Sequence, residues 1–201
     1  MAHPRLARRD DSVLLVVDLQ DTLLKTVQQP DRVLANSALL LRTAKVLGIP
    51  VLATEQNPER LGPTTPAIRE LLGGMAPVGK MAFSCCAASD LKGALRATQR
   101  LTVVLCGVEA HVCVNQTAHG LLEAGYRVHI PRDAVGSSTE ENCWVGLDKA
   151  REAGGVVTSA ETVVFEWLGM AGTAEFRQVL AYVKDASAGR IGGQPMGPAC
   201  P

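Results

Sequence analysis

Short apolar runs alternate with segments of helical spacing along most of this chain, and this alternation restricts the possible fold more than any other feature. The two strongest runs, residues 13–17 and 101–106, are almost entirely apolar and rich in β-branched residues. Runs of this kind are typical of strands buried on both faces. Strands alternating with helices predict an α/β fold with three α-β-α layers, in which helices cover both faces of a parallel sheet of about six strands. We expect the strand order 3-2-1-4-5-6.

The limits of these elements follow from where each pattern starts and stops. We expect strands at residues 13–17, 50–54, 101–106, 127–131 and 155–158, and a short extended stretch before Lys80. We expect helices at residues 31–47, 66–72, 87–97, from the turn after 107 to 125, and at 140–153, 165–168 and 175–183. The chain then divides into an N-terminal extension (1–11), one domain (12–185) and a Gly/Pro-rich tail (186–201) that we expect to be disordered.

Charge and composition exclude several classes of function. Basic and acidic residues number 20 each, so the formal net charge is zero, and only 3% of residues are aromatic. Neither a basic footprint nor stacking platforms for nucleic acid are expected. No apolar run is long enough to cross a membrane, and the N-terminus lacks the apolar core of a secretory signal. Because the six cysteines form no disulfide pattern, we expect a reducing, cytoplasmic compartment.

Three residues with complementary chemistry lie at the ends of different predicted elements. Asp18 follows the first strand, Lys80 follows a short extended stretch, and Cys113 lies in the first turn of the helix after the fourth strand. The topology brings the first and fourth strands together at the switch point of the sheet, where ligands bind. An acid, a cation and a thiol are the parts of a nucleophilic site. Taken singly, each residue is more often structural, and Cys113 alone is more often a small buried hydrophobe.

Other motifs are weaker. Residues 74–80 match the spacing of a P-loop, but Met81 replaces the Ser or Thr that binds magnesium, and Pro77 has no N–H to offer a phosphate. The chain has no G-x-S-x-G elbow, which disfavours a serine hydrolase. Its four histidines have no zinc spacing. His111 could line the site, although a turn histidine is more often solvated, and His129 is expected to be a core histidine with its hydrogen bonds satisfied.

The motifs together resemble the isochorismatase-like cysteine hydrolases, and in particular the isochorismatase domain-containing group. The resemblance runs over nearly the whole chain. It rests on residues 17–20 (VDLQ), the Lys80 segment, residues 107–114 (GVEAHVCV) followed by 116–118 (QTA), and residues 54–58 (TEQNP) with 61–64 (LGPT). Each motif alone is weak, and their combination is specific.

The resemblance implies a role for each matching residue. Cys113 would be the nucleophile, Asp18 the general base, and Lys80 the cation that holds both in place. A cis peptide would join Val108 to Glu109, and the N–H groups of Glu109 and Cys113 would form an oxyanion hole.

The implied reaction is hydrolysis of a C–N, amide-like bond of a small molecule through a thioester on Cys113. Gln20, Gln56 and Phe83 would contact the substrate. Nicotinamidases of this family carry an Asp-x-His metal motif where this chain has Thr54-Glu55-Gln56, so we expect no metal and no cofactor. Isochorismatases proper lack the cysteine, so isochorismate is not the expected substrate. The resemblance also implies a homo-oligomer.

One alternative of a different class stays open. A non-catalytic member of the family would use the same fold for binding, with Cys113 as a thiol that is oxidised reversibly. Turnover of amides distinguishes an enzyme from such a redox sensor.

Overall fold

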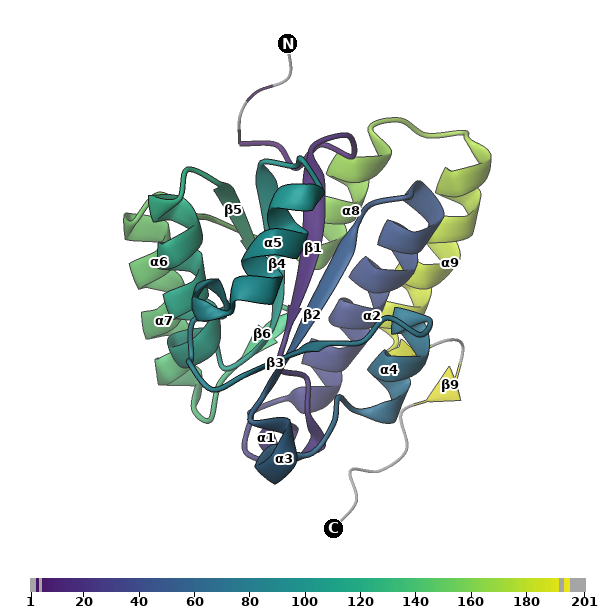
Figure 1. Cartoon of the computed structure of the whole chain (residues 1–201). Coiled ribbons are helices and arrows are strands. Elements are labelled where there is room, and N and C mark those ends of the chain that lie inside the picture. The colour runs from purple at the N-terminus through teal and green to yellow at the C-terminus, as the bar shows by residue number, and fades with distance from the viewer. Residues whose placement is uncertain (1–2, 4, 192–193, 196–201) are drawn as a thin grey trace.

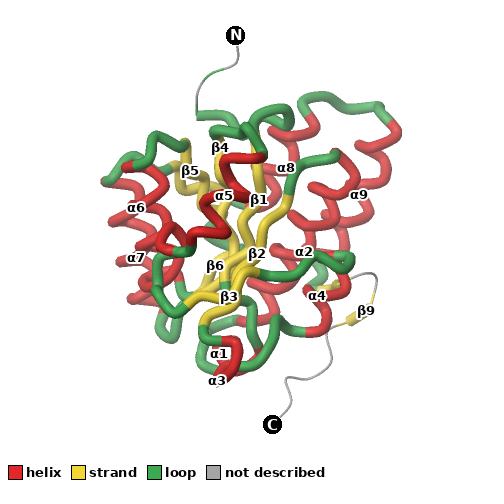
Figure 2. Tube along the Cα trace, in the orientation of Figure 1, coloured by secondary structure: helices red, strands yellow, loops and turns green. Residues whose placement is uncertain are grey.

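The computed structural model describes residues 3, 5–191 and 194–195. Its centre is a parallel sheet in the order β3-β2-β1-β4-β5-β7, with a short seventh strand, β6, beside the end of β4 (Figures 1 and 2). The expected order is confirmed, because β7 is the sixth strand that the sequence predicts and β6 is an addition of two residues. The bounds are β1 (Ser12–Val17), β2 (Val51–Gln56), β3 (Val78–Lys80), β4 (Thr102–Val108), β5 (Arg127–Pro131), β6 (Val135–Gly136) and β7 (Val156–Thr158).

The helices cover both faces of this sheet, as the sequence predicts (Figure 1). They are α1 (Asp21–Leu24), α2 (Pro30–Leu47), α3 (Pro58–Leu61), α4 (Pro66–Leu72), α5 (Ser89–Ala97), α6 (Asn115–Glu123), α7 (Glu140–Glu152), α8 (Ala160–Leu168) and α9 (Ala174–Ser187). A 3-10 turn (Cys85–Ala87) precedes α5, and a π-helical turn (Ala110–Val114) leads into α6. None of the helices among the described residues is long and apolar enough to cross a membrane.

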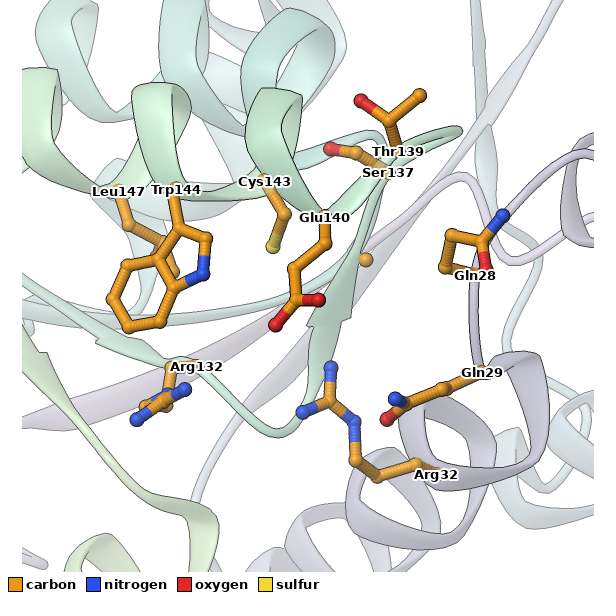
Figure 3. A pocket seen from close by; sticks show the side chains of 11 residues that line it. Gln28, Gln29, Arg32, Arg132, Ser137, Thr139, Glu140, Cys143, Trp144 and Leu147 are labelled. Atoms are coloured by element: carbon orange, nitrogen blue, oxygen red, sulfur yellow. The ribbon is translucent and has the colours of Figure 1, made fainter.

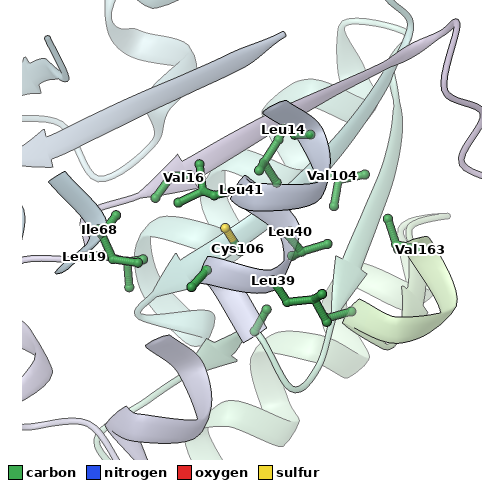
Figure 4. Packing of buried hydrophobic residues seen from close by; sticks show 14 of the residues in the cluster. Leu14, Val16, Leu19, Leu39, Leu40, Leu41, Ile68, Val104, Cys106 and Val163 are labelled. Atoms are coloured by element: carbon green, nitrogen blue, oxygen red, sulfur yellow. The ribbon is translucent and has the colours of Figure 1, made fainter. Parts of the chain in front are cut away.

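Alternate residues of β1 enter two separate hydrophobic cores. Leu14 and Val16 face the core formed with α2, α4, α8 and α9 (Figure 4), whereas Val13 and Leu15 face the core formed with α5, α6 and α7. All six residues of β1 are buried. Burial on both faces explains why this strand reads as a continuous apolar run rather than an alternating one.

Gly107 lies inside β4, and the expectation that it ends the strand is wrong. Its φ is +121°, and a Cβ at this position would lie 1.9 Å from the carbonyl oxygen of Val17. Glycine is therefore required here because β4 passes directly against the end of β1. The strand continues to Val108, which places the following turn beside Asp18.

Other element limits shift for local reasons. β2 extends to Gln56, two residues past its expected end, because Glu55 and Gln56 pair with β3. α8 begins at Ala160 rather than Phe165, since the Ser159 side chain accepts a hydrogen bond from the N–H of Thr162 and caps the helix. The C-terminal tail starts later than expected: α9 continues to Ser187, and Arg190–Ile191 pairs with Gln194–Pro195. Residues 196–201 of that tail lie outside the described part.

Candidate active site

Asp18 is the first residue beyond β1 and is fully buried. Its backbone has a positive φ of 52°. One carboxylate oxygen accepts a hydrogen bond of 2.7 Å from the Thr54 hydroxyl, and the other accepts one of 2.7 Å from the Lys80 ammonium. Both oxygens are thus held by donors from neighbouring strands, β2 and β3. A buried carboxylate needs such partners to remain ionised.

Lys80 ends β3, and its side chain is only 1% exposed. Its ammonium contacts Asp18 and the side-chain oxygen of Gln56, both at 2.7 Å. The carbonyl oxygens of Ala82 and Phe83 lie at 3.4 and 3.2 Å. The sulfur of Cys113 lies 3.7 Å from the same nitrogen. Lys80 therefore links the carboxylate to the thiol.

Cys113 lies in the π-helical turn between β4 and α6 and is 5% exposed. The structure thus brings Asp18, Lys80 and Cys113 together, as we expect from the ends of β1, β3 and β4 meeting at one edge of the sheet. The turn begins at Ala110, so Cys113 precedes the first residue of α6, Asn115.

Burial sets the charge state of the Cys113 thiol in this cluster. Burial raises the pKa of the Cys113 thiol to about 12, the charge of Asp18 and its hydrogen bond with the thiol act in the same direction, and Lys80 only partly opposes them. Burial also acts to lower the pKa of Lys80, but the charge and hydrogen bond of Asp18 outweigh it, so this pKa is raised. At rest a charged Lys80 ammonium therefore lies beside a neutral Cys113 thiol. The helix N-terminus alone does not make Cys113 a thiolate.

The residues expected to contact substrate lie near this cluster but differ in their freedom to do so. Gln20 is fully buried, and its side-chain amide bonds the backbone of Gln56 and Gly62. The Gln56 side chain accepts from Lys80 and donates to the carbonyl of Met81. Both amides are engaged in holding the loops around Lys80. Phe83, by contrast, is 52% exposed.

The turn before Cys113 is held by contacts with the segment after β6. The Val108–Glu109 peptide bond is cis. The Glu109 carboxylate accepts a 2.8 Å hydrogen bond from the N–H of Ser138. The hydroxyl of Ser137 lies 3.0 Å from Nδ1 of His111, so the turn after β6 is tied to the turn that carries Cys113.

Thr54 is the residue of this cluster to which the sequence interpretation assigned no role. Its hydroxyl donates to Asp18 and lies 3.6 Å from the sulfur of Cys85. The signal for Thr54 is the parallel register that places it opposite Val17, the residue before Asp18. That register becomes visible only after the two strands are paired.

Glu55, the one carboxylate of the 54–56 segment, forms its hydrogen bonds with Thr64 rather than with the cluster around Lys80. Its carboxylate accepts hydrogen bonds from the N–H and the hydroxyl of Thr64, at 2.7 and 2.8 Å. Within the described part of the chain, no group of three or more His, Cys, Asp or Glu side chains is arranged to hold a metal ion.

Comparison with known sequences identifies the family of this chain. The family model described as the isochorismatase domain matches residues 12–162. The secreted isochorismatase effector Isc1 of Phytophthora sojae is 36% identical over 178 residues, which cover 87% of this chain and 85% of that protein. Human isochorismatase domain-containing protein 2 is 31% identical over 186 residues, which cover 92% and 89%.

Solved structures with the same fold include two informative neighbours. The structure of the MAR1 ribonuclease from Caenorhabditis elegans has a TM-score of 0.84 and 31% identity, and the match covers 94% of this chain and 97% of that one. The YcaC gene product of Escherichia coli, described as an octameric hydrolase of unknown specificity, has a TM-score of 0.82 and 24% identity, with coverage of 95% and 93%. On the family model, the relatives and the shared sheet order, this chain belongs to the isochorismatase family, with the hydrolase fold of that family.

Proposed function

We propose that this protein is a cysteine hydrolase that cleaves a C–N, amide-like bond of a small molecule without a metal or cofactor. The observation that carries the proposal is the position of the Lys80 ammonium, 2.7 Å from the Asp18 carboxylate and 3.7 Å from the Cys113 sulfur. A base and a nucleophile bridged by a buried cation form an arrangement suited to covalent catalysis.

The first half of the reaction forms a thioester. The Cys113 thiol gives its proton to the Asp18 carboxylate while the sulfur attacks the carbonyl carbon, so no resting thiolate is needed. The negative charge moves to the carbonyl oxygen, where the backbone N–H groups of Glu109 and Cys113 would hold it. The C–N bond then breaks, and Asp18 passes its proton to the departing amine.

The second half releases the acid. Asp18, ionised again, takes a proton from water, and the resulting hydroxide attacks the thioester carbon. The C–S bond breaks, and the proton returns from Asp18 to the Cys113 sulfur. Lys80 stays protonated throughout and stabilises the anion present at each stage. Each oxyanion donor in such a site is typically worth on the order of 3 kcal/mol in the transition state.

Two further properties belong to the same proposal. Phe83 lines the mouth of the substrate site, and Gln20 and Gln56 hold its loops in place. The protein is a homo-oligomer, because Met81 and Phe83, which are 70% and 52% exposed, offer an apolar surface beside Lys80 that a second subunit could cover. The octameric state described for YcaC supports an assembly of this kind.

A panel of small primary amides, carbamoyl compounds and imides tests the proposal. We expect release of amine or ammonia by the wild type, no release by Cys113→Ala, and unchanged turnover by Cys86→Ala, a neighbouring half-buried thiol outside the cluster. Intact-mass spectrometry of the quenched reaction should show an acyl group on the wild type that is absent from Cys113→Ala. EDTA should leave turnover unchanged.

Three outcomes would contradict this function. Turnover that survives in Cys113→Ala would remove the nucleophile. Loss of turnover in EDTA and its recovery with zinc would show a metal enzyme. Absence of turnover, together with reversible oxidation of Cys113 under mild peroxide, would favour the redox-sensing alternative. RNA is added to the panel, with no cleavage expected, because the structural neighbours include a MAR1 ribonuclease from Caenorhabditis elegans and putative ones from Leishmania.

A further inference from the structure

A second pocket lies away from Asp18, Lys80 and Cys113, between the start of α2, the turn after β6 and the first turns of α7 (Figure 3). Its volume is about 80 Å³, and none of the three catalytic candidates lines it. In Figure 3 the side chains of Arg32, Arg132 and Glu140 extend into the same space from three different elements. The family resemblance assigns no role to this pocket.

Two guanidinium groups give the pocket its charge. Arg32 comes from α2, and Arg132 follows β5. Among the residues that the structure describes, neither arginine takes part in an ion pair within 4.0 Å, and the buried Nε of Arg32 has no hydrogen-bond partner. A buried donor without a partner is costly, so it is a natural point for a ligand to bind.

Cys143 lines the same pocket and feels both guanidinium charges. Burial raises the pKa of this thiol, and the charges of Arg32 and Arg132 act in the opposite direction, while Glu140 adds to the increase. Two positive charges and one negative charge therefore surround the cavity. Its net charge of about +1 matches a monoanion better than a dianion.

One side of the pocket is apolar and aromatic, whereas Gln28, Gln29, Ser137 and Thr139 add polar groups elsewhere in its lining. The guanidinium of Arg132 lies 4.6 Å from the centre of the Trp144 ring, a cation–π contact that fixes its plane. Leu147 lines the same side (Figure 3). A ligand for this pocket thus needs a planar anionic group for the arginines and a short apolar part for Trp144 and Leu147.

We propose that this pocket binds a short-chain monocarboxylate, whose carboxylate is held by Arg32 and Arg132 and whose alkyl part lies against Trp144. The pocket also shares a segment with the catalytic edge. Ser137 lines the pocket, and its hydroxyl lies 3.0 Å from Nδ1 of His111, two residues before Cys113. The pocket is therefore connected, through Ser137, to the turn that supports the nucleophile.

The fluorescence of Trp144 can measure ligand binding in this pocket. Trp144 is 40% exposed and lines the pocket, whereas Trp167 is 2% exposed in the core. Titration of the full-length protein with sodium propionate should give a saturable change with a dissociation constant in the millimolar range, about what so small a ligand can reach. 1-Propanol and propylamine, which lack the negative charge, should give no saturable change. Trp144→Phe should remove the signal.

Isothermal titration calorimetry with propionate then locates the anion, because Arg132 itself contacts the fluorescent ring. Arg32→Gln and Arg132→Gln should each weaken binding about 10-fold or more, as expected for loss of a charge-assisted hydrogen bond. Arg151→Gln is the matched control, because it also removes one positive charge. Arg151 lies on α7, and its side chain is 51% exposed and outside the pocket. It should leave affinity unchanged.

Several results would overturn the proposal. They are the absence of saturable propionate binding, equal affinities in Arg132→Gln and Arg151→Gln, and tighter binding of inorganic phosphate than of propionate. Circular dichroism melting curves of all variants establish that they are folded. If Arg32→Gln does not fold, Arg32→Lys, which keeps the charge but loses the two-pronged geometry, should still weaken binding. Propionate binding that persists in Cys113→Ala would show that this pocket binds its ligand independently of the proposed nucleophile.

Discussion

Lys80 and His129 are both buried titratable residues on strands of one sheet, yet their surroundings are opposite. The Lys80 ammonium has contacts to Asp18, Gln56, two backbone carbonyls and Cys113. His129 is 0% exposed in β5, and among the described residues neither of its ring nitrogens has a hydrogen-bond partner. Burial is common to both, so the partners account for the difference.

The two pKa values move in ways that follow from these partners. Burial acts to lower the pKa of Lys80, but the Asp18 carboxylate outweighs it and the pKa is raised. Burial lowers the pKa of His129 to about 4, and the charge of Arg127 adds to the effect. Lys80 therefore stays charged and His129 stays neutral at pH 7. Only Lys80 has the features of a catalytic group. The sequence interpretation of His129 as a core residue is confirmed, whereas the expectation that the hydrogen bonds of His129 are satisfied is wrong.

The largest expected effect is that of Lys80→Met. This change leaves the Asp18 carboxylate buried without a cation, with the Thr54 hydroxyl and the Cys113 thiol as its side-chain partners. Breaking a buried pair in this way costs about 3–5 kcal/mol of unfolding free energy. Turnover should fall at least about 100-fold, because the transition state loses its only adjacent cation among the described residues. Urea denaturation and amide turnover measure the two effects.

The double variant Asp18→Asn/Lys80→Met separates the two consequences. It should recover part of the lost stability, because no buried charge is left unpaired, and it should recover no turnover. Equal stabilities of the single and double variants would show that the ion pair is not the source of the loss.

The next effect is the acid sensitivity that His129 confers. Its folded-state pKa of about 4 lies below the ordinary value of 6.5, so the unfolded chain takes up the proton first. Stability should be full above about pH 6.5 and should fall by on the order of 3 kcal/mol as the pH drops towards 4. Urea denaturation across this range measures the slope.

His129→Leu should flatten this pH dependence, since the variant has no proton to take up at this site. His119→Gln is the control, because its ring already bonds the carbonyl of Asn115 and is only partly buried. The same slope in wild type and His129→Leu would contradict the assignment of acid sensitivity to this residue.

The smallest expected effect comes from a comparison of substitutions at two buried threonines, Thr54 and Thr43. Thr54→Val removes the 2.7 Å hydrogen bond to Asp18 and should cost about 2 kcal/mol, the range for bonds to charged groups. Turnover should fall about 10-fold as the carboxylate loses its orientation. Thr43 is also fully buried, but its hydroxyl has no partner among the described residues, so Thr43→Val should be neutral or stabilising. Chemical denaturation of both variants and kcat/KM for the first provide the measurements.

Most of the fold was predictable because its signals are local. The limits of α4 and β5 match the sequence pattern to the residue, and α2 ends at Gly48 in a left-handed conformation, as its sequence indicates. Gly107 was misinterpreted for a physical reason. A glycine within an apolar run is typical of a strand end, and only the carbonyl of Val17 on a neighbouring strand shows that the chain continues in extended form.

The amino-acid sequence by itself determined the alternation of strands and helices, and with it the sheet edge at which Asp18, Lys80 and Cys113 meet. It could do so because hydrophobic periodicity and turn residues act over short distances along the chain. The tertiary structure alone decided that Cys113 is a neutral thiol at rest, that Thr54 holds Asp18, and that Arg32 and Arg132 share a pocket. Those properties depend on burial and on charges from distant segments, because electrostatic free energies are set by neighbours in space rather than in sequence.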